Sequence, residues 1–269
     1  MKPCLITFDL DKTVLPTIDT IAPGTVEAIR MAMDAGHRVM LASARPPSMT
    51  RWVYDALDLN TPMCNYNGAY RFDPKGEVPL DETKFSVEFM ADLVEKATKL
   101  GIVDFYIEDG DDFHTCREPF TPYFKERKRL GNHKWISLDN IPIISSHRLV
   151  IYSPTEEVRA EVEKLLDSYG FVFYYTFSNF AGGIRTIFNH NAMSKWIAIQ
   201  KMADYYGIDR ENIYTFGDED NDYEMIRNAA HGYAMRGSAA HLQEGFNPTR
   251  LTCEEGGVAD TIIHEILGK

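Results

Sequence analysis

A short apolar run near the start of the chain ends in two carboxylates. Residues 5–8 are rich in β-branched and aromatic side chains, and they predict a buried strand. Asp9 and Asp11 follow at its carboxyl end. Side chains alternate along a strand, so these carboxylates face the same side only if the strand stays extended through both. Because two carboxylates that close disfavour each other's ionisation, the pair predicts a divalent metal site, an acid and nucleophile pair, or both.

An ordinary structural role is the alternative for the segment Asp9-Leu10-Asp11-Lys12-Thr13. Aspartate, lysine and threonine are also common in turns and at helix caps, and the spacing D-x-D-x-T arises often by chance. The residues farther along the chain decide between the two interpretations.

Length and composition limit the class of protein. For 269 residues two domains are expected, and a net charge of −12 argues against a general nucleic-acid binder. No apolar run approaches the roughly 20 residues of a membrane helix. The four cysteines show neither a CxxC pair nor histidines at zinc-ligand spacing. We therefore expect a monomer or small homo-oligomer of the cytosol, with no membrane or nucleic-acid partner.

One cluster of basic residues departs from the acidic character of the chain. A solvated loop is the expected structure for this cluster. Steering of an anionic ligand is the alternative. Its members are Lys125, Arg127, Lys128, Arg129 and Lys134.

A helix and a second strand follow the first strand. Val26, Ile29 and Met33 recur at helical spacing, and Thr25 is predicted to be the N-cap. Residues 38–42 form a second short apolar run. Strand, helix and strand make a βαβ unit, for which a parallel sheet with a right-handed crossover is expected.

Polar side chains also follow the second strand. Open parallel sheets bind their ligands at the carboxyl ends of the strands. Ser43 lies at such an end, where its hydroxyl is predicted to bond a phosphate oxygen. A cap for a helix over residues 48–57 is the structural alternative. Arg45 adds a cation at the same edge.

The middle of the chain has a different pattern. Helices interleaved with strand pairs over residues 83–188 predict an α+β module inserted into a first domain made of residues 1–82 and 189–269. Four polar residues of the module are candidate substrate contacts, although each also fits a solvent-facing or structural role. These are His114, Arg117, Asn179 and Arg185.

The parallel pattern returns after the insertion. Ser194 is the predicted N-cap of a helix, and Lys195 lies in its first turn, either by chance or to meet an anion held there. Residues 212–216 then form another strand. The strand ends in the acidic segment Gly217-Asp218-Glu219-Asp220-Asn221-Asp222, just as the first strand ends in Asp9.

Together these residues resemble the four motifs of the haloacid dehalogenase superfamily. The segment 9–13 matches the first motif, Ser43 the second, Lys195 the third and residues 217–222 the fourth. The inserted module is similar to the cap of the Cof-type, class IIB sugar-phosphate phosphatases. The resemblance implies an α/β fold with a Rossmann-like parallel-sheet core and an α+β cap that selects the substrate.

The resemblance also implies a reaction, the Mg²⁺-dependent hydrolysis of small phosphate monoesters, sugar phosphates above all. Asp9 would be the nucleophile that forms an aspartyl-phosphate, and Asp11 the general acid and base. Mg²⁺ would be held by Asp9, Asp218 and the backbone carbonyl of Asp11. Asp222 would orient a metal-bound water or pair with Lys195. The contacts to the phosphate would come from Ser43, Arg45, Lys195 and Asn221.

Other functions fit parts of this pattern less well. A phosphomutase of the same superfamily would return the phosphoryl group to a sugar. A non-catalytic sugar-phosphate-binding relative would have no need of Asp11. A haloacid dehalogenase needs no metal, and residues 217–222 would then serve no purpose. A phosphatase is therefore the preferred prediction.

Overall fold

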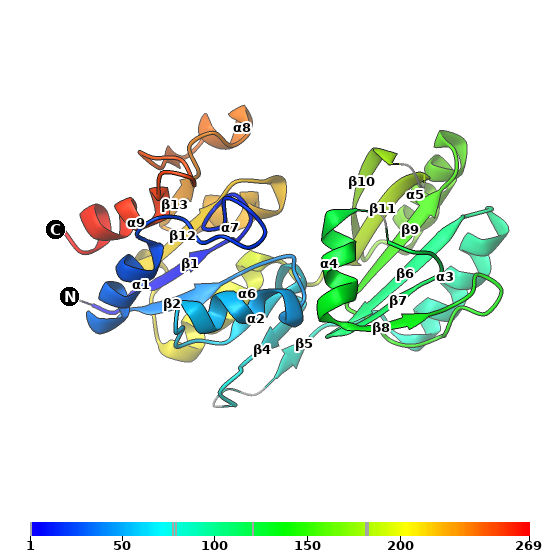
Figure 1. The fold of residues 1–269 in the computed structure, drawn as a ribbon, viewed down its shortest axis with the longest axis horizontal. Helices are drawn as coiled ribbons and strands as arrows, with labels where there is room; N and C mark the ends of the chain where they lie inside the picture. The colour runs from blue at the N-terminus through cyan, green and yellow to red at the C-terminus, as the bar shows by residue number, and fades with distance from the viewer. Residues whose placement is uncertain (1, 77, 79, 120, 181–182) are drawn as a thin grey trace. The chain divides into compact units, whose positions relative to one another are not determined.

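The structure, a computed structural model, describes residues 2–76, 78, 80–119, 121–180 and 183–269, without the side chains of 178–180. The chain divides into two compact units, which Figure 1 shows. The first comprises Met1–Arg45, Thr50–Leu80 and Ser194–Lys269, and the second comprises Pro46–Met49 and Asp81–Met193. In the described part of the chain, no helix is long and apolar enough to cross a membrane.

A five-stranded sheet forms the centre of the first unit. The strands run in the order β14-β13-β12-β1-β2, and each pairs with its neighbour in parallel. All four residues of β1 are buried, which explains their apolar character. The order brings the residues that follow β1, β2 and β12 to one edge of the sheet. The bounds are β1 (Leu5–Phe8), β2 (Arg38–Leu41), β12 (Ile213–Gly217), β13 (His231–Ala234) and β14 (Asn247–Pro248).

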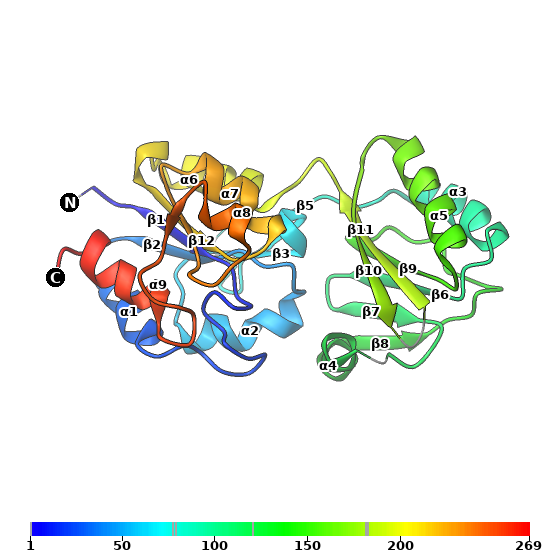
Figure 2. The ribbon, with the colours of Figure 1, turned by 90° about the horizontal axis from the view of Figure 1, so that it is seen from above.

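Helices cover both faces of this sheet, as Figure 2 shows. Helices α6 (Lys195–Tyr206) and α7 (Tyr223–Asn228) lie on one face, and α1 (Thr25–Asp34) and α9 (Gly257–Thr261) lie on the other. Side chains of α1 and α9 join those of β1 in one apolar core. The further elements are α2 (Pro47–Ala56), α8 (Ala240–Gln243), β3 (Met63–Asn65), β4 (Tyr70–Phe72), the 3₁₀ turns η1 (Tyr66–Gly68), η2 (Arg210–Asn212) and η3 (Asp220–Asp222), and the π turn η4 (Ile262–Ile266).

The two predicted helix caps have different outcomes. The hydroxyl oxygen of Ser194 accepts the backbone N–H of Ile197 at 3.2 Å, so the predicted cap of α6 is confirmed. The predicted cap of α1 is wrong, because Gly24 occupies the N-cap position and Thr25 is the first helical residue. Gly24 turns the chain with φ at 73°, a conformation that favours glycine, and Thr25 is thereby buried inside the first turn.

A six-stranded sheet forms the second unit, and its mixture of helices and strands confirms the predicted α+β insertion. Its order is β10-β11-β9-β6-β7-β8, antiparallel except for the parallel pair β7 and β8. Helices α3 and α5 bury their apolar residues against one face. Strand β5 (Asp81–Glu82) comes before this sheet in the chain and is not part of it. The bounds of the other elements are α3 (Val87–Lys99), β6 (Asp104–Asp109), β7 (Asp112–Thr115), α4 (Pro122–Leu130), β8 (Asn132–Trp135), β9 (Arg148–Ser153), α5 (Glu156–Tyr169), β10 (Val172–Phe180) and β11 (Gly183–His190).

The basic cluster lies on helix α4 and strand β8, so the prediction of a loop is wrong. Thr121 caps the helix and Phe124 buries its ring in an aromatic core, and together they stabilise a segment of low mean hydropathy. Most of the positive charges are matched locally. The surface ion pairs are Lys128 with Glu118, Arg129 with Glu126, and Lys134 with Asp112. This pairing favours a solvated surface over the steering of a ligand.

A buried ion cluster links α4 to the sheet of the second unit. The carboxylate of Glu108 accepts hydrogen bonds from Arg148 Nε at 2.8 Å and from Arg127 Nε at 3.2 Å. The side chains of Glu108 and Arg127 are fully buried, and that of Arg148 is 4% exposed. One carboxylate therefore compensates two guanidinium groups that water does not reach.

Substitution of Glu108 by glutamine should strongly destabilise the second unit. The change removes the negative charge that both buried guanidinium groups contact, and we expect a loss of about 3–5 kcal/mol in the free energy of unfolding, measured in guanidinium chloride. Glu95→Gln is the matched control, because Glu95 pairs with Lys99 on the surface. The control should leave the unfolding transition unchanged. A Glu108→Gln transition that coincides with the control would show that the cluster adds nothing to stability.

Candidate functional site

A buried lysine joins three distant parts of the first unit. Lys195, the first residue of α6, is 1% exposed. Its Nζ lies 2.5 Å from Oδ1 of Asp9 and 2.6 Å from Oδ1 of Asp222. Burial alone would lower the pKa of Lys195, but Asp222 and Asp9 raise it above its usual value. The lysine is therefore a fixed positive charge at the ends of β1 and β12.

Asp9 follows β1 and is held at the sheet edge by its own backbone. Its N–H donates to the carbonyl of Phe216 on β12 at 2.9 Å. Burial raises the pKa of Asp9 well above its usual range, although Lys195 opposes the rise. Neighbouring carboxylates raise it further, in the order Asp222, Asp11 and Asp218. Lys195 alone does not compensate the negative charge that gathers here.

Both carboxylate oxygens of Asp222 accept hydrogen bonds from nearby groups. Its Oδ1 accepts from Lys195, and its Oδ2 accepts the backbone N–H groups of Asp218 at 3.0 Å and Glu219 at 3.2 Å. The close approach requires a glycine before the loop, because a Cβ on Gly217 would lie 2.4 Å from the Cβ of Asp222. Asp222 thus anchors the loop and Lys195, which is one of the two roles predicted for it.

Asp218 lies at the same edge, where it accepts a hydrogen bond that the sequence does not predict. The hydroxyl of Thr13 donates to Oδ1 of Asp218 at 3.2 Å. Burial raises the pKa of Asp218 to about 7, and the negative charges of Asp222 and Glu219 contribute. The sequence signal for Thr13 is its position in the first motif.

The donor set of the cluster fits a hard divalent cation. Carboxylate oxygens of Asp9, Asp218 and Asp222 all lie within 4.8 Å of one another. Among the described residues, no hydrogen bond reaches Oδ2 of Asp9 or Oδ2 of Asp218. When all three carboxylates are ionised, the one ammonium group leaves two negative charges uncompensated, which a bound cation would offset. Oxygen ligands and an excess of negative charge are what Mg²⁺ prefers in proteins.

The carboxylate of Asp11 is held by Arg45. Arg45 Nε donates to Oδ2 of Asp11 at 2.9 Å, and Nη2 donates to Oδ1 at 2.5 Å. The strand does not continue to Asp11, because β1 ends at Phe8 and Lys12 is left-handed with φ at 55°. The alternation of a strand therefore does not relate Asp9 to Asp11. Arg45, which is predicted to bind phosphate, donates two parallel hydrogen bonds to the second carboxylate.

Ser43 and Asn221 lie on two further loops of this edge. Ser43 is 1% exposed, and its Oγ accepts the backbone N–H of Arg45 at 3.1 Å. The amide nitrogen of Asn221 donates to Oδ1 of Asn67 at 3.1 Å. Asn67 belongs to the turn η1 after β3, so this turn also reaches the edge where the predicted site residues lie.

The candidate substrate contacts of the second unit lie in varied surroundings. His114 and Arg185 are mostly buried, and the guanidinium of Arg185 stacks over the rings of Phe124 and Phe177. Arg117 is exposed. The side chain of Asn179 lies outside the described part of the chain. These four positions remain candidates.

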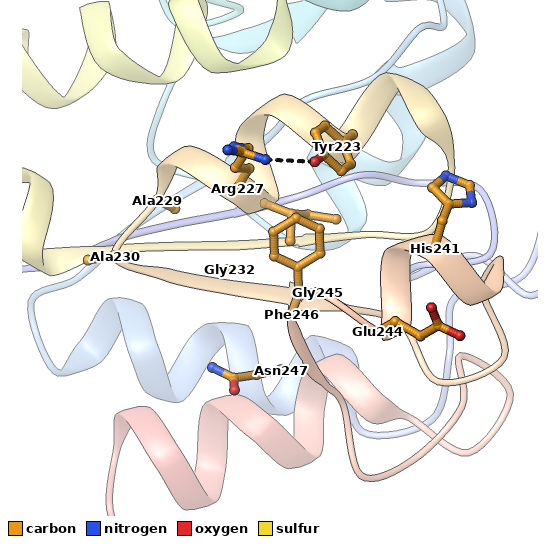
Figure 3. Close-up of a pocket in the computed structure, with 11 residues that line it drawn as sticks. Tyr223, Arg227, Ala229, Ala230, Gly232, His241, Glu244, Gly245, Phe246 and Asn247 are labelled. Carbon is orange, nitrogen blue, oxygen red and sulfur yellow. Dashed lines mark hydrogen bonds between the residues drawn. The ribbon is translucent and has the colours of Figure 1, made fainter.

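A pocket of about 710 Å³ lies beside α7 (Figure 3). Tyr223 and Arg227 of α7 line it together with Phe246, and Arg227 Nη1 donates to the hydroxyl of Tyr223 at 2.9 Å. The lining contains none of the residues predicted to bind phosphate.

Comparison with known proteins identifies the family of the chain. Residues 6–262 match the haloacid dehalogenase-like hydrolases. The 5-amino-6-(5-phospho-D-ribitylamino)uracil phosphatase YitU of Bacillus subtilis is 30% identical over 264 residues, which cover 96% of this chain and 96% of that protein. The prediction of an enzyme of the phosphatase class is confirmed.

Solved structures share the fold over nearly the whole chain. A haloacid dehalogenase-like hydrolase from Bacteroides thetaiotaomicron aligns with a TM-score of 0.80 at 22% identity, covering 98% of this chain and 99% of that one. A subclass IIB sugar phosphatase aligns with a TM-score of 0.76 at 21% identity, covering 97% and 98%. The predicted fold, a parallel-sheet core with an inserted cap, is confirmed. The chain belongs to the family of haloacid dehalogenase-like hydrolases.

Proposed function

We propose that this enzyme hydrolyses small phosphate monoesters with Asp9 as the nucleophile. The observation that carries the proposal is the position of Asp9 at the end of β1, 2.5 Å from a buried lysine and beside Asp218. The positive charge of Lys195 is suited to the oxygens of a phosphoryl group, whose charge must be stabilised during transfer.

The proposed reaction has two steps. A carboxylate oxygen of Asp9 forms a bond to phosphorus while the bond from phosphorus to the alcohol oxygen breaks, and the leaving alcohol takes its proton from Asp11. Asp11 then removes a proton from water, whose oxygen bonds to phosphorus as the acyl phosphate bond breaks. Arg45 orients the ionised carboxylate of Asp11 for the second step, in which that carboxylate accepts a proton from water. Ser43 and Asn221 would contact the phosphate.

Mg²⁺ is the proposed cofactor. The unoccupied oxygens of Asp9 and Asp218 would hold it, together with the backbone carbonyl of Asp11. A bound Mg²⁺ neutralises negative charge near the transferring group. Asp222 stays outside the ligand set because both of its oxygens already accept hydrogen bonds.

The proposed substrates are sugar phosphates and related phosphate esters of polyols. Support comes from the resemblance to Cof-type phosphatases and from the similarity to YitU, whose name specifies a phosphorylated ribityl chain. Residues 83–188 would form the cap that selects the leaving group. The four free cysteines support a cytoplasmic location. A monomer or small homo-oligomer is proposed for the assembly.

Replacing Asp9 by asparagine should abolish turnover, because the amide cannot attack phosphorus. We expect at least about a 1,000-fold loss of phosphate release from p-nitrophenyl phosphate. Asp34→Asn, an exposed change at the far end of α1, should keep full activity. Turnover by Asp9→Asn at the rate of this control would overturn the mechanism.

Removal of the metal should stop the reaction, and its return should stabilise the fold. Activity should vanish in EDTA and recover with excess MgCl₂. In thermal unfolding, Mg²⁺ should raise the Tm of the wild type by stabilising the folded state. The shift should disappear in Asp218→Asn and persist in Asp220→Asn, a change on the same loop at a side chain that is 72% exposed. Full activity in EDTA, or equal shifts in both variants, would exclude this metal site.

A panel of phosphorylated metabolites tests the substrate class. Sugar phosphates and 5-amino-6-(5-phospho-D-ribitylamino)uracil should have kcat/KM values at least about tenfold above that of p-nitrophenyl phosphate, because contacts to the leaving group add binding energy in the transition state. A panel in which these esters are no better than p-nitrophenyl phosphate would reject the class. Transfer of phosphate onto a second sugar, in place of its release, would indicate a phosphomutase.

A further inference from the structure

The turn η1 (Tyr66–Gly68) touches three loops of the candidate site. The backbone N–H of Asn67 donates to the carbonyl of Ser43 at 3.1 Å, and its Oδ1 accepts from Nδ2 of Asn221 at 3.1 Å. Gly68 packs against the residue before Lys195, since a Cβ on Gly68 would lie 2.3 Å from the carbonyl oxygen of Ser194. A turn of three residues thus sets the spacing of three predicted phosphate contacts.

The backbone of this turn is in a conformation that few residues adopt. Asn67 is left-handed, with φ at 55° and ψ at 32°, and Tyr66 before it has φ at 50°. Asparagine tolerates this region better than most residues, but glycine adopts it without steric cost. The backbone therefore does not require the asparagine side chain. A different role must explain the carboxamide of Asn67.

The side chain of Asn221 depends on that carboxamide for its orientation. Within the described residues, the bond to Asn67 is the one hydrogen bond that the Asn221 side chain makes. The terminal torsion of an asparagine is broad and roughly two-fold, so an amide without this bond would rotate. The bond uses one N–H of Asn221 and leaves the second N–H in a defined direction.

Building on the proposed phosphatase function, we propose that Asn67 is a positioning residue, which orients the carboxamide of Asn221 toward the phosphate group of the substrate. Asn67 acts through Asn221 and takes no part in the bond changes at phosphorus. The left-handed turn brings its side chain to Asn221, and the bond to Ser43 ties this turn to the loop after β2.

A double-mutant cycle tests the proposal with p-nitrophenyl phosphate and saturating Mg²⁺. Asn67→Gly keeps the turn but removes the carboxamide, and it should lower kcat/KM about three- to tenfold, the effect of one hydrogen bond. Asn221→Ala should change the same kinetic parameter as Asn67→Gly, either kcat or KM, and in the same direction. In the Asn221→Ala background, Asn67→Gly should cost less than about a factor of two, because the residue it positions is gone.

Asp58→Gly is the matched control for the backbone. Asp58 is also a left-handed residue, with φ at 47°, but it is exposed at the end of α2. Both glycine variants should unfold within about 3 °C of the wild type, since the relief of left-handed strain and the entropy of glycine oppose each other. Only Asn67→Gly should lose activity.

Two results would overturn the positioning role. One is a wild-type value of kcat/KM in Asn67→Gly, which would show that Asn67 serves only to form the turn. The other is a double variant whose fold-loss in kcat/KM equals the product of the fold-losses of the two single variants, which would show that Asn67 acts independently of Asn221. Failure of the proposed function is a separate outcome, recognised by absence of Asp9-dependent phosphate release in the wild type.

Discussion

The ammonium group of Lys195, buried between Asp9 and Asp222, is the interaction on which the site depends. It joins the start of α6 to the ends of β1 and β12, three segments that are far apart in the chain. A buried charge without its partner is strongly destabilising, so each of the three positions requires the others. The parallel strand order makes this meeting possible, because it places the ends of β1 and β12 side by side.

The same cluster explains how an acidic protein can receive an anionic substrate. Both carboxylate oxygens of Asp222 accept hydrogen bonds, one from Lys195 and the other from the backbone of its own loop. Asp9 and Asp218 keep one oxygen each, and their pKa values are raised chiefly by burial. A divalent cation at those oxygens would reverse the local sign of the charge, while the surface of the protein stays acidic. The division of roles among the three aspartates follows from their hydrogen bonds.

Part of this site could be predicted from the sequence alone. The apolar runs before Asp9, Ser43 and Asp218 predict strands that end at these residues. The carboxyl ends of parallel strands lie at the same edge of a sheet, where ligands bind. Hydrogen bonds between loops could not be predicted, because they depend on backbone turns that sequence patterns do not specify. Strand β1 ends at Phe8, before both Asp9 and Asp11, so the condition for their facing the same side is not met. The glycine turn before Thr25 removes the expected cap of α1.

The most direct test of the account is to trap the phosphorylated residue. The enzyme would be mixed with substrate, quenched in acid and reduced with borohydride, which converts an aspartyl-phosphate into homoserine, and the peptides would be sequenced by mass spectrometry. The account predicts homoserine at position 9, only after exposure to substrate. Release of phosphate with no modification of Asp9, or with the modification at another residue, would contradict it.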